Sequence, residues 1–340
     1  MAMPLHGPSL NLWAVLSESK RIINAHSRHF LALSVIFLLP LSFSLIVYPT
    51  IHRLLTDSFS VNSHVFLRHT VHFQAQQPPP PPIDHNTLWL TLLYSLFVFV
   101  LSLSAVGTIT YSIFHGFYGR PVKFVSAIKS IITSFLPLLV TVVVSQIIVS
   151  LITLIFGLLL FLVIRGIELL GIQIEYSSPY FIGFSGVLLL ALLLVLVYLQ
   201  VNWTLVSVVV VVESSWGFEP LRRSTGLIKG MKGVALSSLL FFGFFAGILV
   251  WSSWILTMGS DTTANDMWSN WVFVAQIVAT STFLMLILLY NTAANTVLYM
   301  YCKAVHGELA LEIAEEFARE YVSLPFDEGK VPHVVSVVHV

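Results

Sequence analysis

The chain has 340 residues, of which 57% are hydrophobic and only 9% are charged, whereas roughly a quarter of the residues in soluble globular domains are charged. This composition excludes an ordinary soluble domain and predicts an all-α, polytopic membrane helix bundle. Sixteen basic residues balance sixteen acidic ones, so no overall field would attract nucleic acid, and a single cysteine, Cys302, excludes an internal disulfide framework.

Six stretches contain no Lys, Arg, Asp or Glu and reach the length of about 20 apolar residues that an α-helix needs to cross a bilayer. They predict transmembrane helices at about residues 30–51, 88–112, 131–164, 180–212, 234–257 and 272–302. The chain is thereby divided into an N-terminal segment, 1–29, a membrane domain, 30–302, and a C-terminal segment, 303–340. The third and fourth stretches exceed thirty residues, so they must tilt or continue as helix beyond the bilayer.

Basic residues are distributed unevenly among the segments that connect these spans. Thirteen of the sixteen lie in the two terminal segments and in the 113–130 and 213–233 loops, whereas the other side holds three, Arg53, Arg68 and Arg165. Positive charge accumulates on the cytosolic side of membrane proteins, so both termini are predicted to be cytosolic. The choice between an endomembrane and the plasma membrane stays open.

The first three cytosolic segments share a pattern and each runs directly into a span. The matching positions are Leu16, Ser19, Ile22 and Ile23; Val125, Ile128, Ile131 and Ile132; and Leu221, Ser224, Leu227 and Ile228. This spacing predicts short amphipathic helices on the membrane surface, with the apolar side on the lipid and the basic side toward anionic headgroups. The pattern indicates a threefold repeat of surface helix plus transmembrane hairpin. For the 113–130 copy, the alternative is a span that simply begins with basic residues.

The third of these segments also carries a family resemblance. Its order and spacing resemble the pattern E…G…L·RS··L·KG, with matches at Glu213, Gly217, Leu221, Arg223, Ser224, Leu227, Lys229 and Gly230. The pattern is similar to that of a membrane domain fused in some bacteria to glycerophosphodiester phosphodiesterases, and the whole chain resembles an uncharacterised plant family with six spans. The resemblance implies a six-span fold but no hydrolase activity, because the hydrolase of the fused proteins is a separate soluble domain.

The same segment supplies candidate contacts with lipid and with protein. Arg222 and Lys232 join the motif residues as candidate lipid-facing positions. Glu213 needs a cation at the end of its span, so an ion pair with Arg222 or Arg223 is predicted. Glycines spaced four residues apart predict close helix packing at two places, Gly226 with Gly230 and Gly243 with Gly247. Structural packing is favoured here over a ligand site.

Amide side chains within the spans form a candidate polar path for a solute, namely Gln200, Gln276, Asn291 and Asn295. Asn291 and Asn295 lie one turn apart on one helix face. The alternative is a set of interhelical hydrogen bonds of about 1 kcal/mol or less each. No ionisable side chain lies near the centre of a span, which argues against a proton-coupled carrier.

The first loop and the C-terminal segment carry weaker signals. Pro78 to Pro82 predict a stiff spacer. Five histidines of this region are weak zinc candidates without cysteine or clustered carboxylates beside them, so no metal and no cofactor is predicted: His52, His64, His69, His72 and His85. The tail from Lys303 to Tyr321 predicts an acidic amphipathic helix, which either docks on the basic helices or binds a cytosolic protein partner.

No motif for metalloprotease, nucleotide-binding or nucleophile-elbow chemistry occurs in the sequence. The sequence therefore favours a non-enzymatic integral membrane protein that organises or scaffolds the bilayer through its basic helices. A transporter or channel for a small or amphipathic solute is the alternative. A lipid-modifying enzyme ranks last, because only Glu213 and its basic neighbours cluster at one interface.

Overall fold

The computed structural model describes residues 11–51, 85–119, 122–169, 179–258 and 270–313, and in these residues it contains helices and turns but no β-strand. A helix continues from η1 over residues 39–51, and another covers residues 308–313. The labelled elements are α1 (Leu12–Ala25), α2 (Ser27–Leu33), the π-helix η1 (Ser34–Leu38), α4 (His85–Phe117), α5 (Phe124–Leu169), α6 (Pro179–Asn202), α7 (Val206–Glu213), α8 (Glu219–Leu227), α9 (Lys232–Met258) and α11 (Trp271–Val305).

Six helical segments of the described chain are long and apolar enough to cross a membrane. They are Ser27–Ile51, Trp89–Phe117, Phe124–Gly166, Phe181–Glu213, Lys232–Ile255 and Trp271–Val305. Their number confirms the prediction of six membrane helices, and each overlaps one of the six predicted stretches. The protein is therefore an all-helical integral membrane protein.

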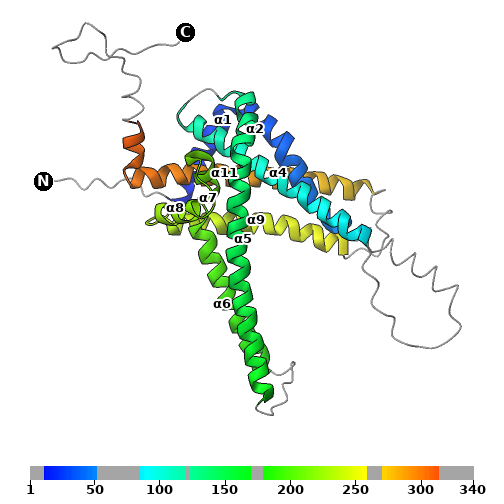
Figure 1. Cartoon of the computed structure of the whole chain (residues 1–340). Coiled ribbons are helices and arrows are strands. Elements are labelled where there is room, and N and C mark those ends of the chain that lie inside the picture. Colours follow the sequence, from blue (N-terminus) through cyan, green and yellow to red (C-terminus); the bar gives the residue numbers. More distant parts are fainter. Residues whose placement is uncertain (1–10, 52–84, 120–121, 170–178, 259–269, 314–340) are drawn as a thin grey trace, which may run out of the picture.

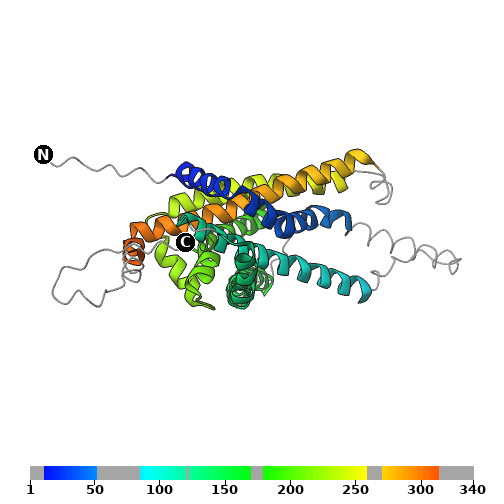
Figure 2. The same cartoon turned by 90° about the horizontal axis from the view of Figure 1, so that it is seen from above.

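Helix α11 lies at the centre of a bundle in which it packs against α1, η1, α4 and α9 (Figures 1 and 2). The side chain of Asn270 caps its first turn by accepting a hydrogen bond from the Val272 amide at 3.1 Å. In its second half, Ala293, Ala294 and Val297 are fully buried. The two alanines are small residues, which let neighbouring helices approach the α11 backbone closely.

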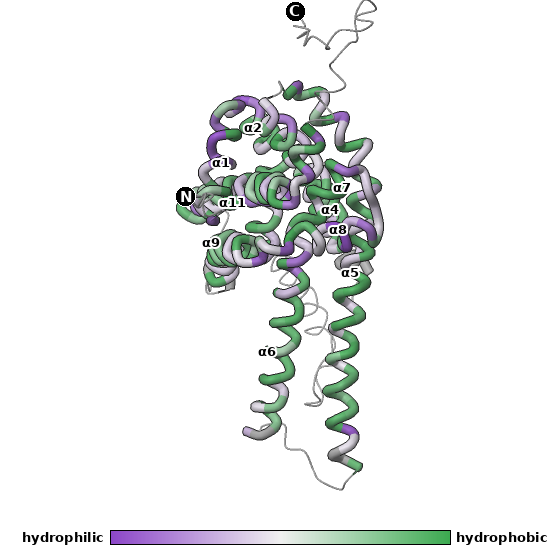
Figure 3. The backbone as a smooth tube through the Cα atoms, turned by 90° about the vertical axis from the view of Figure 1, so that its left-hand side faces the viewer, coloured by the Kyte–Doolittle hydropathy of each residue, from purple (hydrophilic) through white to green (hydrophobic). Residues whose placement is uncertain are grey.

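Helices α5 and α6 form a hairpin, here called the arm, that crosses the direction of α9 and α11 and extends away from the bundle (Figures 1 and 3). The most apolar stretch of α5 has no buried residue, and the same holds for the fourth span. From Ser145 to Arg165 the arm covers about 30 Å at 1.5 Å per residue, which is the thickness of a bilayer hydrocarbon core. Because its helices are apolar on every side, hydrocarbon is their expected surrounding.

The fourth span is interrupted between α6 and α7. At this turn the Val206 amide donates to the Trp203 carbonyl at 3.1 Å. In an uninterrupted helix the same amide would donate to Asn202. The Asn202 carbonyl instead accepts a hydrogen bond of 2.7 Å from the Ser224 hydroxyl of α8. The predicted continuous helix over residues 180–212 is therefore wrong at this point, and α8 replaces the missing helical donor.

The apolar sides of α1 and α8 are covered by protein. Val15, Ser19, Ile22 and Ile23 of α1 are buried, and α1 packs against α11, α4 and α9. On α8 the corresponding side is buried as well, through Pro220, Leu221, Ser224 and Leu227. The prediction that these sides lie on the lipid is wrong, because the bundle supplies a protein surface for them.

The second predicted surface helix has no separate counterpart. Residues 124–131 form the first turns of α5, which continues without a break through Pro137. Val125 and Ile132 are exposed, whereas their counterparts in α1 and α8 lie at packed positions. This segment fits the alternative of a span that begins with basic residues. The threefold repeat as a whole stays a prediction.

One end of the bundle, here called the basic end, carries α8, the start of α1 and the end of α11 (Figures 1 and 2). The ends of the first, second, fifth and sixth spans at residues 51, 85, 258 and 271 lie at the opposite end. Both described termini thus lie on the same side of the bundle, as an even number of spans requires. The cytosolic orientation of this side stays a prediction.

Candidate functional site

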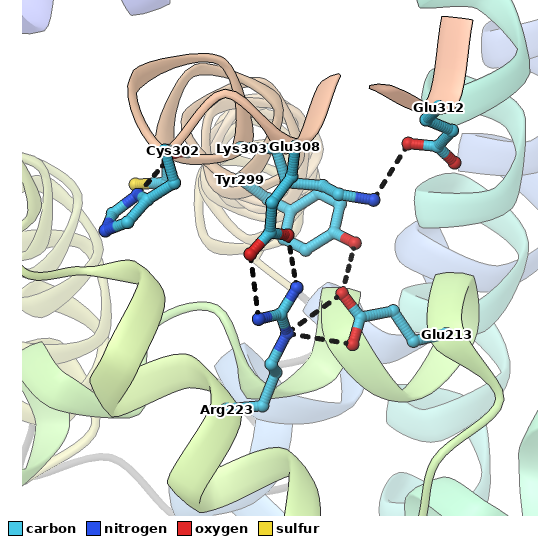
Figure 4. A network of polar contacts seen from close by, with 8 residues as sticks. Glu213, Arg223, Tyr299, Cys302, Lys303, Glu308 and Glu312 are labelled. Carbon is cyan, nitrogen blue, oxygen red and sulfur yellow. Dashed lines mark hydrogen bonds and ion pairs between the residues drawn. The ribbon is translucent and has the colours of Figure 1, made fainter. Parts of the chain in front are cut away.

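Arg223 of α8 connects three parts of the chain at the basic end (Figure 4). Its Nε donates to both carboxylate oxygens of Glu213, at 3.2 and 3.3 Å. Its Nη1 donates to Glu308 Oε1 at 3.0 Å, and its Nη2 donates to Glu308 Oε2. Glu213 Oε1 also accepts a hydrogen bond from the Tyr299 hydroxyl at 2.8 Å. We call Glu213, Arg223, Tyr299 and Glu308 the arginine network.

The predicted ion pair of Glu213 therefore forms with Arg223. The neighbouring Arg222 is exposed and makes no ion pair with any residue that the structure describes. Successive residues of a helix point about 100° apart, so only one of the two arginines can face α7 and α11. The planar guanidinium supplies several donors in one fork, which lets Arg223 hold two carboxylates at once.

Proximity to carboxylates changes the proton affinity of these groups. The hydrogen bonds that Arg223 donates to Glu308 and Glu213 raise the pKa of Arg223 further above its usual range. In the opposite direction, the hydrogen bond from Arg223 lowers the pKa of Glu308 below its usual value. Both groups are thus held in their charged forms, which suits a fixed ionic contact rather than a proton-transfer site.

The C-terminal segment docks through Glu308, as the acidic composition of the tail indicated. A turn at His306 and Gly307 ends α11, and Gly307 adopts a φ of 75°, a conformation that favours glycine. The prediction of one tail helix beginning at Lys303 is therefore wrong, because Lys303 belongs to α11 and a separate helix begins at residue 308. A second contact joins Lys303 Nζ to Glu312 Oε2 at 2.8 Å (Figure 4). The remainder of the predicted tail helix lies outside the described residues.

The predicted glycine packing steps are wrong. A Cβ added at Gly226, Gly230, Gly243 or Gly247 would meet no atom within 4 Å. Gly230 instead has a φ of 93°, after the end of α8. The close approach occurs at Gly116 of α4, where an added Cβ would lie 3.1 Å from Ile22 Cγ2. Helix α1 therefore packs most closely on α4 at a glycine that the spacing rule did not identify.

Other motif residues have separate places. Gly217, with a φ of 77°, donates its amide hydrogen to Thr141 Oγ1 of α5 at 3.1 Å. Lys229 is exposed and makes no ion pair within the described part of the chain. Lys232 Nζ lies 5.1 Å from the centre of the Tyr198 ring. The motif is thus mainly structural, with Arg222 and Lys229 left facing outward.

A pocket of about 270 Å³, here called the amide pocket, lies where the base of the arm meets the bundle. Its wall combines apolar, hydroxyl and amide side chains from six helices and the turn between α6 and α7, namely Leu138, Thr141, Val142, Ser145, Gln200, Trp203, Thr204, Val206, Ser207, Leu221, Leu239, Asn291 and Asn295. None of these residues is ionisable. Three of the four residues of the predicted polar path, Gln200, Asn291 and Asn295, are therefore brought together.

The fourth residue, Gln276, is exposed and takes no part in the pocket. It precedes Asn291 by fifteen residues on α11, or about 22 Å at 1.5 Å per residue. The four amides consequently do not line one continuous path, and that prediction is wrong for Gln276. The polar residues form a local site instead.

Three of the four hydroxyl groups of the amide pocket are bonded to nearby backbone, whereas the Ser207 hydroxyl and the three amides are not. Thr141 donates to the Pro137 carbonyl at 2.8 Å, Ser145 to Val142 at 2.8 Å and Thr204 to Gln200 at 2.9 Å. By contrast, the side-chain amides of Gln200, Asn291 and Asn295 have no hydrogen-bond partner among the described residues. The predicted alternative, in which these amides bond between helices, is therefore not what the structure contains.

The two sites share helices α7, α8 and α11. Asn291, Asn295, Tyr299 and Lys303 follow at four-residue steps along α11, from the amide pocket to the arginine network. Leu221 of α8 lines the pocket two residues before Arg223. Tyr299 was not identified as a site residue from the sequence, although its four-residue spacing from Asn295 was a usable signal.

No group of three or more His, Cys, Asp or Glu side chains able to hold a metal ion occurs in the part of the chain that the structure describes. The loop histidines considered for zinc lie outside the described residues or, for His85, have no described side chain.

Comparison with known proteins identifies one family. Neither the curated proteins nor the solved structures contain a match to the chain. A family model described as a domain of unknown function, DUF8558, matches residues 8–325. The resemblances to a plant family and to the bacterial fused domain stay predictions. Since the matched region includes all six membrane helices, the arginine network and the amide pocket, the chain belongs to the DUF8558 family.

Proposed function

We propose that this protein binds an uncharged small or amphipathic molecule in the amide pocket, as a non-enzymatic carrier or facilitator in the membrane. The observation that supports this proposal is the convergence of Gln200, Asn291 and Asn295 on one pocket with their amides unpaired. Because none of these amides bonds to a described residue, each is available to form hydrogen bonds with a molecule in the pocket. A pocket with a few convergent polar groups is also the usual form of a small-molecule site.

The double substitution Asn291→Leu and Asn295→Leu should remove bound molecules from the purified protein. Each amide hydrogen bond contributes about 1 kcal/mol, so losing two should reduce occupancy about tenfold or more at subsaturating ligand. Native mass spectrometry of protein extracted in mild detergent would measure the fraction of chains that retain an uncharged adduct. Gln276→Leu is the matched control, because it removes an exposed amide of the same helix. Equal retention by the double variant and the wild type would contradict the proposal.

A second candidate is the membrane-organising role, which exposed cations support. Arg222 and Lys229 at the basic end are exposed, and so are Lys123 and Lys129 at the start of α5. None of them forms an ion pair with a described residue, so they are available to anionic headgroups. Arg223 and Lys232, which were candidates for the same role, already have partners within the protein. A docked C-terminal segment could additionally present its outer side to a cytosolic protein.

Charge reversal at two of these positions, Arg222→Glu and Lys229→Glu, should weaken the association of phosphatidylserine with the protein. A basic residue near an anionic surface contributes about 1 kcal/mol, so the relative affinity should fall several-fold. The motionally restricted fraction of spin-labelled phosphatidylserine in phosphatidylcholine vesicles would measure it. The charge-preserving exchange Arg222→Lys with Lys229→Arg is the control, and spin-labelled phosphatidylcholine should not respond. An unchanged phosphatidylserine fraction after reversal would refute this role.

A further inference from the structure

The unpaired amides of the amide pocket define what an occupant must offer. Each side chain of Gln200, Asn291 and Asn295 carries a carbonyl acceptor and an NH₂ group with two donors. Ser207 and Trp203 add a hydroxyl and an indole N–H that also lack a hydrogen-bond partner among the described residues. An occupant that only accepts would leave the three amide carbonyls unpaired, and one that only donates would leave the three NH₂ groups and the indole N–H unpaired. Hydroxyl groups do both.

Charge is disfavoured in this pocket. No ionisable side chain lines it, and an isolated charge in a low-dielectric site carries a large desolvation cost. The cation of α8 closest in sequence to the pocket residue Leu221 is Arg222, which is exposed, followed by Arg223, which is bound to Glu213 and Glu308. The occupant is therefore neutral.

The surroundings of the pocket indicate where the rest of the occupant lies. Five of the six pocket-lining helices and the turn between α6 and α7 belong to the predicted spans, and α8 is the exception. Apolar side chains beside the lining residues are exposed: Val143 by 45% and Ile147 by 61% on α5, and Leu240 by 59% on α9. At about 270 Å³ the pocket falls just below the range of pockets that enclose drug-sized ligands, roughly 300–1,000 Å³. It has room for a polar headgroup but not for long chains.

We propose that the amide pocket holds the headgroup of an uncharged, hydroxyl-bearing lipid, whose acyl chains stay in the bilayer and contact the exposed apolar residues of α5 and α9 next to the pocket. This inference rests on the proposed function and names the class of molecule that the pocket selects. Diacylglycerol is a member of that class, and phosphatidic acid is its counterpart with a charged phosphate. Free glycerol carries the same hydroxyl chemistry without the chains, so it distinguishes a lipid from a soluble solute.

Photolabelling of the full-length protein in phosphatidylcholine vesicles tests the assignment. Diacylglycerol and phosphatidic acid probes would carry the same photoreactive group in the acyl chain. The diacylglycerol probe is expected to label wild type about tenfold more than the Asn291→Leu, Asn295→Leu variant, for two hydrogen bonds lost. Gln200→Leu, an exposed position on a different helix, should reduce labelling about threefold and serves if the double variant does not fold. Phosphatidic acid should label all variants equally and weakly, and the crosslinks of diacylglycerol should map to α5 and α9.

The outcomes separate this inference from the function on which it rests. Competition by millimolar glycerol would assign the site to a soluble polyol and overturn the lipid assignment. Stronger labelling by phosphatidic acid than by diacylglycerol would show that the pocket does not select an uncharged headgroup. Suppose that diacylglycerol labels wild type and variants equally, while the adduct seen by native mass spectrometry still depends on Asn291 and Asn295. The lipid class is then wrong and the proposed function stands. If neither the diacylglycerol labelling nor the adduct depends on Asn291 and Asn295, both the lipid assignment and the proposed function are refuted.

Discussion

Replacing Arg223 with methionine should lower the free energy of unfolding by about 2 kcal/mol, because it leaves the carboxylates of Glu213 and Glu308 without their cation. Breaking a fully buried pair costs about 3–5 kcal/mol, and the smaller figure allows for solvent screening of a side chain that is 37% exposed. Methionine keeps the length of the aliphatic part, so the change tests the charge and the hydrogen bonds. Titration with SDS in mixed micelles, followed by tryptophan fluorescence, would measure the difference.

Arg222→Met is the matched control for this experiment. It removes the same charge from the adjacent position of α8, where the side chain is exposed and has no ion-pair partner in the described chain. Its effect should stay within about 0.5 kcal/mol, as for most surface substitutions. Equal effects of the two substitutions would show that the arginine network adds no stability beyond the general charge of the basic end. Glu308→Gln should reproduce about half of the Arg223→Met effect, since Glu213 keeps its partner.

Ser224→Val is expected to destabilise the protein by about 3 kcal/mol through two separate causes. The Ser224 hydroxyl supplies the hydrogen bond that the Asn202 carbonyl lacks at the break between α6 and α7, so its loss leaves a buried acceptor unpaired. In addition, Ser224 is fully buried, and the larger valine side chain has no space to occupy. The same SDS titration would measure the loss.

Two further substitutions separate these causes. Ser224→Ala removes the hydrogen bond without adding volume, so it should show between a third and two thirds of the full effect. Thr225→Val, at the next position of α8, removes a hydroxyl that bonds to the Leu221 carbonyl within the same helix. It should change the free energy of unfolding by less than about 1 kcal/mol, because the Leu221 carbonyl lies within α8 and still accepts a backbone hydrogen bond there. An Ser224→Val effect no larger than that of Thr225→Val would contradict the role assigned to this serine.

The spans were predictable because they depend on local properties. Twenty apolar residues without charge identify a membrane helix regardless of what it packs against. The break after Asn202 was not predictable from the same signal, since Trp203, Thr204 and Leu205 are as compatible with a span as their neighbours. It depends on Ser224, a donor twenty-two residues away that the fold brings to the freed carbonyl.

The amphipathic pattern of α1 and α8 was read correctly as helical but assigned to the wrong surface. An apolar face has the same sequence whether lipid or protein covers it. Only the three-dimensional arrangement shows that Ile22 and Leu227 pack in the core of the bundle. The glycine steps failed for a related reason, because spacing indicates where helices can approach and not where they do.

The candidate site was predictable in part. Gln200, Asn291 and Asn295 were identified as polar residues in apolar stretches, and the structure places all three in the amide pocket. Gln276 met the same criterion but faces outward, because polarity alone does not give the direction of a side chain. Among the other lining residues, Trp203 and Ser207 have no distinguishing signal in the sequence. Their position follows from the turn between α6 and α7.

The arginine network also constrains the order in which the chain can assemble during its synthesis. Glu213 and Arg223 are ten residues apart, whereas Tyr299 follows Glu213 by 86 residues and Glu308 follows Arg223 by 85. At translation rates of about 5–20 residues per second, 85 residues take roughly 4–17 s to appear. During that interval Arg223 has one carboxylate of the network instead of two. The contact between α8 and the C-terminal segment therefore forms only after the last membrane helix has been made.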